Sequence, residues 1–526
     1  MSKNQSFRYI LWILLSVFVG YAPMLANHFT LDDAILLTAP YPQTFSDVIY
    51  LFSEPVPHQL LLHYRPLTFL SFVADHYFWG DNPIGFHVTN LCLAALSAVT
   101  AFVLLQSLLS LKEAFLSVLL FSLCPASSEA IFSIYNRSQI LGSLGLFLSV
   151  IFWHYALKKN TCSWAWMLGS AGTLFLGCLA KENAFVTPLI CLLWTWVCPA
   201  SPNRRKMIWF GFLFQGMACI AYLYLRYRIV GAIGFQKVDS FLPAEASILT
   251  RYINMCWIFT QYVQLLFFPV SLSCDYPLQP VFFHGAAFVC PLLFLFFGTL
   301  LIRRNFVGKK AGFGGFWFLI HLLPALHGIP IQIPFAERLL YPAALGGMIL
   351  LALGFQKISK RMSSFFLFFL IFGNLGILWT RCLDWKTEDR LWEKTLQQYP
   401  SSYRAWIYFG TQAMLKKNWT LAFDCYHRAG ALNPNRQNRI LLLHNLAHLY
   451  LQLNQKKRAR SFFSQVLELE PYHRPTCWAL GDLAAQERQW NSAIFWYEKV
   501  VFPVNRWDRE SLLIQQRIHF CEQSKQ

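Results

Sequence analysis

The feature that most constrains this chain is a succession of long apolar runs that continues as far as residue 380. A helix of about 20 apolar residues crosses the roughly 30 Å hydrocarbon core of a bilayer, and its backbone hydrogen bonds are satisfied internally. The runs therefore predict transmembrane helices rather than a soluble core. We expect about eleven spans, near residues 9–27, 86–109, 115–135, 139–157, 163–180, 184–199, 207–227, 282–302, 313–328, 340–356 and 363–380.

Composition supports a polytopic membrane protein. Hydrophobic residues make up 56% of the 526 positions and charged residues only 13%, whereas charged residues reach about 25% in soluble domains. The net charge of +18 lies largely in short clusters between apolar runs, where membrane orientation and anionic headgroups account for it, so it does not indicate nucleic-acid binding. The 14 cysteines are scattered, without a CxxC pair or a Cys/His zinc spacing, so we expect no disulfide framework, metal site or cofactor.

Basic residues fall on alternate connections between the expected spans, which predicts the orientation. The first run lacks a small-residue cleavage site and is expected to remain as the first span. With a cytoplasmic N-terminus, the clusters lie inside, and residues 28–85, 230–281 and everything after 380 lie outside. Residues 230–281 include an apolar stretch that we expect to lie on, or dip into, the outer face, because a crossing there would reverse the later clusters. The clusters are Lys3 with Arg8, Lys112, Lys158–Lys159, Arg204–Lys206, Arg303–Arg304 with Lys309–Lys310, and Lys357 with Lys360 and Arg361.

A repeat of about 34 residues follows residue 380. Its recurring positions are Trp406, Gly410, Ala422, Ala429 and Pro434, then Leu446, Ala447, Tyr450, Ala459 and Pro471, then Leu480, Gly481, Ala493 and Tyr497. We expect a transmembrane domain at 1–380, a linker helix at 381–402, three tetratricopeptide repeats at 403–505 and a capping helix at 506–526. The concave face of such an α-solenoid normally binds an extended peptide.

An acidic pair, Asp32–Asp33, stands where the first apolar run ends. The alternative to a functional site is a solvated helix exit, but carboxylates at this depth are functional by default. A carboxylate here can act as a general base, because burial and a like-charged neighbour raise its pKa. Further polar motifs follow in order: "HYRPL" with Arg65, "GFH" with His87, "EAIFSIYNR" with Glu129 and Arg137, "KEN" with Lys181 and Glu182, and "ERLLYP" with Glu337, Arg338 and Tyr341.

In this order, with the repeats behind them, the motifs resemble the transmembrane and tetratricopeptide-repeat-containing O-mannosyltransferases and their bacterial relatives. The resemblance covers nearly the whole chain and implies the all-α GT-C membrane glycosyltransferase fold. It also implies a sugar donor carried on a lipid phosphate and transfer on the outer or luminal face. Asp32 and Asp33 would then be catalytic, with Asp33 slightly preferred as the base.

The cations of these motifs are the expected phosphate ligands, since a lipid-phosphate leaving group is stabilised by surrounding positive charge. They are Arg65, Arg137, Lys181 and Arg338, and their alternative role is as snorkelling anchors. Glu129, Glu182, Glu337 and Tyr341 are expected in support, although the glutamates more often pair with nearby cations. His87 is more often a hydrogen-bonded core histidine than a substrate contact.

We therefore expect an inverting, polyprenyl-phosphate-sugar-dependent glycosyltransferase that transfers a mannose-like hexose to a hydroxyl of a protein or peptide held by the repeats. Its expected location is the bacterial inner membrane with extracytoplasmic repeats, or the endoplasmic reticulum with luminal repeats. Two alternatives remain open. One is a non-catalytic, membrane-anchored repeat scaffold for envelope proteins, in which the acidic pair is dispensable. The other is a transferase of the same fold that acts on a glycan or lipid.

Overall fold

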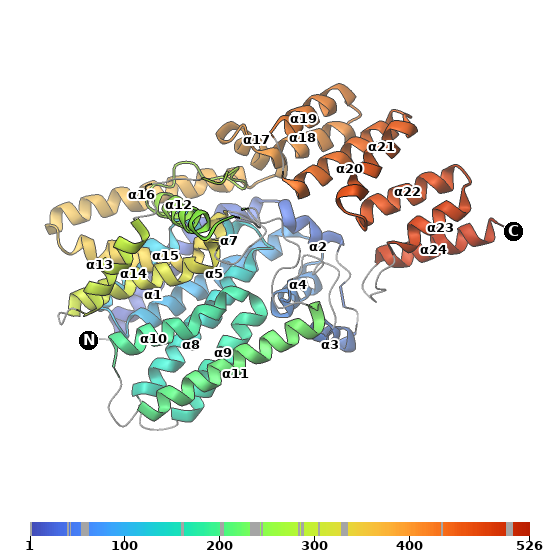
Figure 1. Ribbon diagram of the computed structural model, residues 1–526. Coiled ribbons are helices and arrows are strands. Elements are labelled where there is room, and N and C mark those ends of the chain that lie inside the picture. Colours follow the sequence, from blue (N-terminus) through green and yellow to red (C-terminus); the bar gives the residue numbers. More distant parts are fainter. Residues whose placement is uncertain are drawn as a thin grey trace. The chain divides into compact units, whose positions relative to one another are not determined.

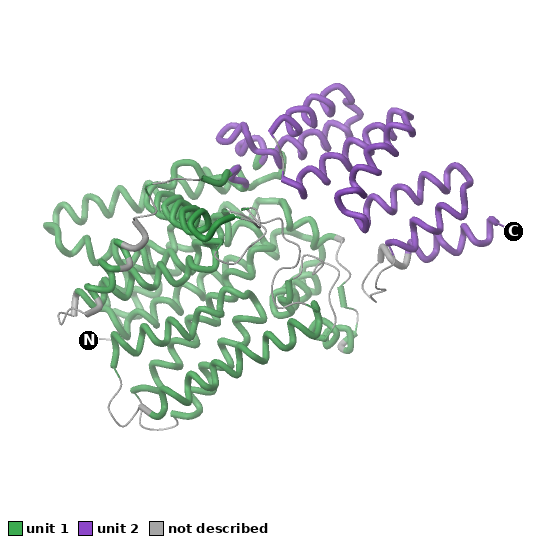
Figure 2. The backbone as a smooth tube through the Cα atoms, in the orientation of Figure 1, with its two compact units in different colours: residues 1–54, 61–274, 278–391 green, residues 55–60, 275–277, 392–526 purple. Residues whose placement is uncertain are grey.

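The part of the chain described by the computed structural model is helical and contains no β-strand (Figure 1). It comprises residues 3–38, 41–42, 44–53, 63–158, 163–199, 205–231, 242, 246–281, 285, 289–302, 306–327, 335–432, 435–500 and 509–525. The expected all-α class is confirmed. The chain divides into two compact units (Figure 2), unit 1 with residues 1–54, 61–274 and 278–391, and unit 2 with residues 55–60, 275–277 and 392–526.

Unit 1 contains the membrane-spanning helices. Seven of its described helices are long and apolar enough to cross a bilayer, which makes the chain a multi-pass membrane protein but does not confirm the expected count of about eleven. The seven are α1 (Lys3–Tyr21) with the turn η1 (Ala22–Ala26), α5 (Pro83–Leu105), α8 (Arg137–Lys158), α9 (Ser163–Ala180), α11 (Arg205–Val230), α15 (Tyr341–Phe355) with the preceding turn η9 (Glu337–Leu340), and α16 (Lys360–Asp384).

The other described helices of unit 1 lie between these spans. They are α2 (Ile35–Thr38), α3 (Phe45–Ser53), α4 (Pro66–Trp79), α6 (Leu111–Ser122), α7 (Glu129–Phe132), α10 (Thr187–Val197), α12 (Ile248–Phe267), α13 (Val289–Ile302) and α14 (Phe306–Leu322). Single 3-10 turns complete the unit: η1 (Ala22–Ala26), η2 (Leu31–Ala34), η4 (Pro125–Ser127), η5 (Glu182–Val186), η8 (Leu323–Ala325) and η9 (Glu337–Leu340).

The expected span at 115–135 was wrong. Helix α6 ends at Ser122, and the chain then makes the turn η4 and the single helical turn α7 before α8 begins. Pro125 explains the break, since it has no N–H to donate and disfavours helical backbone at the preceding Cys124. Polar Glu129 and Arg137 are thereby placed beside this irregular segment instead of inside a straight span.

Hydrogen bonds and an ion pair define two ends of unit 1. At one end Ser6 at the start of α1 bonds Gln106 after α5, over 3.1 Å. Glu113 near the start of α6 also pairs there with Lys310 of α14, at 2.6 Å. At the other end Asn27 after α1 donates to the carbonyl of Cys382 late in α16. Several expected basic clusters therefore share one end, whereas Lys159, Arg204, Arg303 and Arg304 lie outside the described residues.

Small residues let neighbouring helices approach closely. A Cβ atom at Gly145 of α8 would lie 2.6 Å from the Cα atom of Gly177 on α9, so only glycine fits this crossing. Such small-residue contacts are the usual way in which membrane helices pack. The α8–α9 pair positions the first turn of α8 next to the residues that follow α9.

Unit 1 extends beyond the expected boundary at residue 380. Helix α16 continues to Asp384, and Arg381 on its last turns is buried against Glu337 at 2.9 Å. The division between the units falls after Leu391, inside α17 (Glu388–Gln398). A buried ion pair holds the end of α16 in unit 1, which is why these residues do not form a separate linker.

After the end of α17, the described residues of unit 2 form three helical hairpins followed by a last helix. The hairpins are α18 (Tyr403–Leu415) with α19 (Trp419–Ala431), α20 (Arg436–Gln452) with α21 (Lys456–Leu469), and α22 (Arg474–Gln486) with α23 (Trp490–Glu498). Helix α24 (Arg509–Gln523) packs on α23 through a shared cluster that includes Tyr497 and Ile514.

The same turn closes each hairpin. Lys417, Asn454 and Arg488 all adopt a left-handed backbone, with φ of 57°, 57° and 58°. In the third hairpin the N–H of Gln489 donates to the carbonyl of Ala484 at 2.9 Å, which caps the end of the helix. A recurring cap at the repeat spacing shows that the hairpins are structural repeats. Of the expected marker positions, Pro434 lies outside the described residues.

Glycine and tyrosine close two of the hairpins. A Cβ atom at Gly410 would lie 2.4 Å from the ring of Tyr426, and one at Gly481 equally close to the ring of Tyr497. The second hairpin uses Ala447 and Phe463 in the corresponding cluster. The small and aromatic residues that recur at the repeat spacing in the sequence are therefore the residues that pack the two helices of each hairpin together.

Candidate functional site

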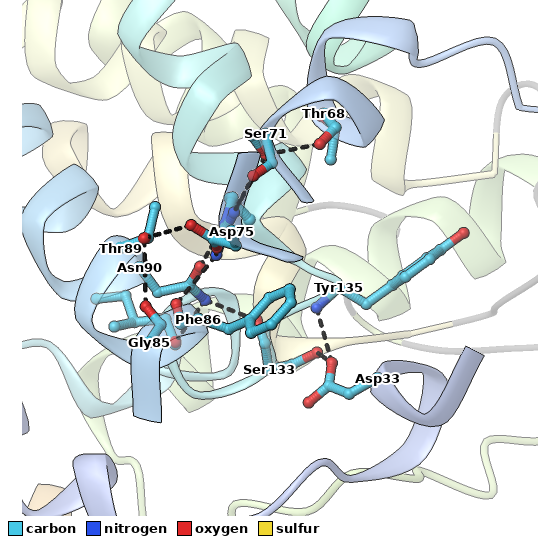
Figure 3. Close-up of polar contacts among 12 residues, drawn as sticks. Asp33, Thr68, Ser71, Asp75, Gly85, Phe86, Thr89, Asn90, Ser133 and Tyr135 are labelled. Carbon is cyan, nitrogen blue, oxygen red and sulfur yellow. Dashed lines mark hydrogen bonds and ion pairs between the residues drawn. The ribbon is translucent and has the colours of Figure 1, made fainter. Parts of the chain in front are cut away.

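The acidic pair lies in the turn η2, immediately after α1 and η1. Thr30 and Asp33 form a capping box there, and Asp33 is fully buried. The Asp33 carboxylate accepts hydrogen bonds from the Tyr135 N–H at 2.7 Å and the Ser133 hydroxyl at 3.1 Å (Figure 3). Burial raises the pKa of Asp33 to about 7, and the Tyr135 N–H opposes this rise.

Asp32 has a different environment from its neighbour. Its side chain is half-buried and lies within electrostatic range of Arg338 and Tyr135. Successive side chains on a helical turn point about 100° apart, so the two carboxylates face different surroundings. Asp33 is held by the protein, whereas Asp32 is the member of the pair that is accessible to a substrate.

Two arginines of the candidate site, Arg338 within electrostatic range of Asp32 and Arg65, are paired with glutamates. The Arg338 guanidinium bonds Glu129, and its backbone N–H donates to the same carboxylate at 2.9 Å. Arg65 bonds Glu182 through Nε at 3.0 Å and Nη2 at 2.8 Å. The other oxygen of Glu182 accepts from Arg226 of α11 at 2.9 Å. These pairs tie η9, η4 and α7 together at one place, and α4, η5 and α11 at another.

Lys181 is a buried cation for which the structure describes no carboxylate partner. Its Nζ atom lies 3.5 Å from the Ser138 hydroxyl, and among the described residues no carboxylate oxygen lies within 4.0 Å of it. Arg65 and Arg338 both act on it repulsively. Burial first, and then these two cations, lower the pKa of Lys181 well below its usual range, and the more distant carboxylates of Glu182 and Glu129 oppose this decrease only in part. This part of the site therefore favours a bound anion.

Arg65, Lys181 and Arg338 form a cation cluster, to which Arg137 does not belong. It is completely buried, and its Nε atom donates to Asn90 at 2.6 Å and its Nη2 atom to Asp75 at 2.5 Å. Its remaining N–H groups bond backbone and hydroxyl oxygens of Ser71 and Phe86. The expected role of Arg137 in phosphate binding is corrected accordingly, because a guanidinium saturated inside the fold cannot contact a substrate.

The remaining expected residues lie in the interior of unit 1. His87 is buried in α5, Glu337 pairs with Arg381, and Tyr341 packs its ring against Phe121 at 5.2 Å between centroids. They support the helices around the site rather than the cation cluster itself.

Sequence reasoning missed Asp75, Arg226 and the turn at Ser133–Tyr135. Asp75 is a single charge inside an apolar stretch and Arg226, with Arg228, ends one, which is the signal that could have found them. Nothing in the sequence indicated that the backbone of Tyr135 would hold Asp33.

Comparison with known proteins gives one family match and several relatives. The tetratricopeptide repeat family matches residues 441–473. Mouse protein O-mannosyl-transferase TMTC3 is 23% identical over 78% of this chain and 48% of its own length. The Caenorhabditis elegans protein O-mannosyl-transferase F38B6.6 is 23% identical, over 76% of this chain and 59% of its own. Human protein O-mannosyl-transferase TMTC4 is 25% identical over 69% and 57%.

The chain resembles the TMTC O-mannosyltransferases. This confirms the resemblance seen in the motifs. The chain spans about half the length of the TMTC relatives it matches. Among solved structures, a crystal structure of ArnT from Cupriavidus metallidurans bound to undecaprenyl phosphate covers 91% of this chain and 80% of its own, with a TM-score of 0.42 and 12% identity. That structural similarity is too low to assign the fold.

Proposed function

We propose that the chain is a GT-C-like membrane glycosyltransferase that transfers a mannose-like sugar from a polyprenyl-phosphate donor to a hydroxyl of a protein or peptide. The observation that carries this proposal is the buried Lys181, which has no described carboxylate within ion-pair distance and lies within electrostatic range of Arg65 and Arg338. Arg338 in turn lies within electrostatic range of Asp32. The TMTC resemblance supplies the reaction class.

The cations would hold the donor phosphate. A sugar–phosphate–lipid diester carries one negative charge, and Lys181 has no described carboxylate oxygen within ion-pair distance, although Glu182 and Glu129 act on it from farther away. Binding would restore the proton on Lys181, since an adjacent anion favours the ammonium form. The same positive field would then stabilise the lipid phosphate as it departs.

Transfer would proceed in one displacement with inversion at the anomeric carbon. The acceptor hydroxyl oxygen bonds to the anomeric carbon while the bond between that carbon and the phosphate oxygen breaks, and the hydroxyl proton passes to a carboxylate. Geometry favours Asp32 as this base, because Asp33 is enclosed and already accepts hydrogen bonds from the turn at Ser133–Tyr135. We therefore place Asp32 ahead of Asp33, the reverse of the preference drawn from the sequence.

The arrangement of unit 1 supports a proposal for the membrane face, and the nature of unit 2 supports one for the acceptor. Lys112 and Lys310 belong to the end opposite the acidic pair, and basic residues favour the cytoplasmic side. This supports a site on the extracytoplasmic face, in a bacterial inner membrane or in the endoplasmic reticulum. Three hairpins of the tetratricopeptide type favour a polypeptide acceptor.

Donor binding tests the phosphate site. Lys181→Met should weaken binding of a mannosyl-phospho-polyprenol to the full-length protein in nanodiscs by roughly 10- to 100-fold, the range expected for a charge-assisted hydrogen bond. Lys112→Met is the matched control, because it removes an exposed lysine at the other end of unit 1. Equal donor affinity in the parent and Lys181→Met would remove the main support for the proposal.

Turnover tests the acidic pair. Asp32→Asn should bind the donor normally and lower transfer by roughly 10²–10⁴, the usual contribution of a general base. Transfer at the parent rate by the Asp32→Asn/Asp33→Asn double variant would instead favour a non-catalytic repeat scaffold.

A further inference from the structure

A buried polar network begins at Asp75 on α4. Its carboxylate accepts from the Thr89 hydroxyl at 2.6 Å (Figure 3). It also pairs with Arg137 at 2.5 Å. Both partners are almost completely buried, with 4% of Asp75 and none of Arg137 exposed. Arg137 also lies over the ring of Phe72. The network therefore joins α4, α5 and the first residue of α8.

Asn90 connects this ion pair to the turn before α8. Its Oδ1 atom accepts from Arg137, and its Nδ2 atom donates to the carbonyls of Ile131 at 3.1 Å and Ser133 at 3.2 Å. The same turn supplies the hydroxyl of Ser133 and the N–H of Tyr135 to Asp33. A continuous series of polar contacts thus runs from Asp75 to the acidic pair.

Stability alone does not require such a network. A buried ion pair can usually be replaced by apolar residues of similar volume without loss of stability. A polar network in which every member is satisfied does fix one geometry, because any shift leaves a buried group unpaired. Here the geometry that is fixed is the turn holding Asp33, the immediate neighbour of Asp32.

We propose that Asp75 and Asn90 are positioning residues for the acidic pair. Asp75 and Asn90 together hold Arg137, and Asn90 also bonds the turn at Ile131–Tyr135, which donates to Asp33 and so sets the position of Asp32. Neither residue contacts substrate. The proposal rests on the proposed function, since it concerns the transfer step. The charged groups around Asp33 are Asp32 on its own turn and Arg137 from α8.

A stability cycle tests the physical connection without any transfer assay. The Tm of the full-length protein is measured for Asp33→Asn, Asn90→Ala and their combination. If the turn connects the two sites, the double variant should lose less than the sum of the single losses, because each change loosens the same contacts. Asn254→Ala is the matched control: Asn254 is equally buried, its carboxamide also bonds backbone on both sides, and its losses should add to those of Asp33→Asn.

Kinetics test the role in transfer. Asn90→Ala should lower kcat by roughly 10- to 100-fold, the effect of a small misplacement of a reacting group, with the KM for donor within about threefold of the parent. Asn254→Ala should keep kcat within about threefold, although it also lowers Tm. If Asn90→Ala does not fold, Asp75→Asn takes its place, since it keeps the shape of the side chain.

Three results would decide against the inference. Additive Tm losses for Asn90→Ala and Asp33→Asn would show that the network does not reach Asp33. A parent-like kcat in Asn90→Ala, with transfer abolished in the Asp32→Asn/Asp33→Asn double variant, would overturn the positioning role alone. Parent-rate transfer by that double variant would overturn the proposed function as well.

Discussion

Replacing Asp33 by asparagine should change the pH dependence of folding in a predictable direction. Burial raises the pKa of Asp33 from its usual 3.8 to about 7. Between these values the folded protein keeps a proton that the unfolded chain has lost, so stability falls as pH rises through this window. At about 1.4 kcal/mol per pH unit, the unfolding free energy that the parent loses through Asp33 between pH 3.8 and pH 7 amounts to as much as about 4 kcal/mol. The Asp33→Asn variant does not lose it, because its carboxamide cannot titrate.

The measurement compares the unfolding free energy of parent and Asp33→Asn in detergent at several pH values from 4 to 8. The parent should become progressively less stable relative to the variant up to about pH 7, and the difference should then level off. Asp389→Asn is the control, because it removes an exposed carboxylate from the first turn of α17, and its difference should change much less. A difference in unfolding free energy that does not change with pH, or that changes in the opposite direction, would refute the conclusion that burial favours the protonated form of Asp33.

Three further changes test the packing. Asp75→Ala should destabilise the protein by about 3–5 kcal/mol, because it leaves Arg137 buried without a counter-charge. Replacing both members of the pair, Asp75→Leu with Arg137→Met, should destabilise it less, and thermal unfolding of the two variants would show which loses more stability. Arg488→Gly should slow hydrogen exchange in α22 and α23 of the full chain, because glycine relieves a left-handed backbone by roughly 0.5–1 kcal/mol. Gly481→Ala should speed that exchange, since its Cβ would meet the Tyr497 ring and cost roughly 1–3 kcal/mol.

The sequence predicted the two-part organisation because hydrophobic length and a 34-residue spacing are both visible without a structure. It failed at 115–135, where a hydrophobic run looks continuous although Pro125 interrupts the helix. Hydropathy measures transfer into lipid and takes no account of one missing N–H. The expected boundary of the membrane domain also fell at residue 380, whereas unit 1 continues to Leu391. The ion pair between Arg381 and Glu337 joins residues far apart in the chain, so hydropathy does not reveal it.

The candidate site was predictable in its residue types but not in their division of labour. Isolated charges near apolar runs indicated Arg65, Lys181 and Arg338. Arg65 and Arg338 lie within electrostatic range of Lys181, with Arg338 also within range of Asp32. The same signal indicated Arg137, which the structure instead buries with partners on α4 and α5. Whether a cation is saturated or free depends on residues far away in sequence, and no local pattern carries that information.

The ion pair between Glu113 and Lys310 has a consequence for biosynthesis. Its partners are separated by 197 residues, so at the usual 5–20 residues per second the ribosome needs roughly 10–40 s to make the lysine after the glutamate. Helix α6, with 12 residues, is only about 18 Å long and cannot cross the bilayer by itself. During that interval Glu113 lacks its cation and α6 lacks a complete set of neighbours. The final seating of α6 must therefore await synthesis of α14, and a nascent chain halted before Lys310 should present α6 to the insertion machinery in a different position from that of the finished protein.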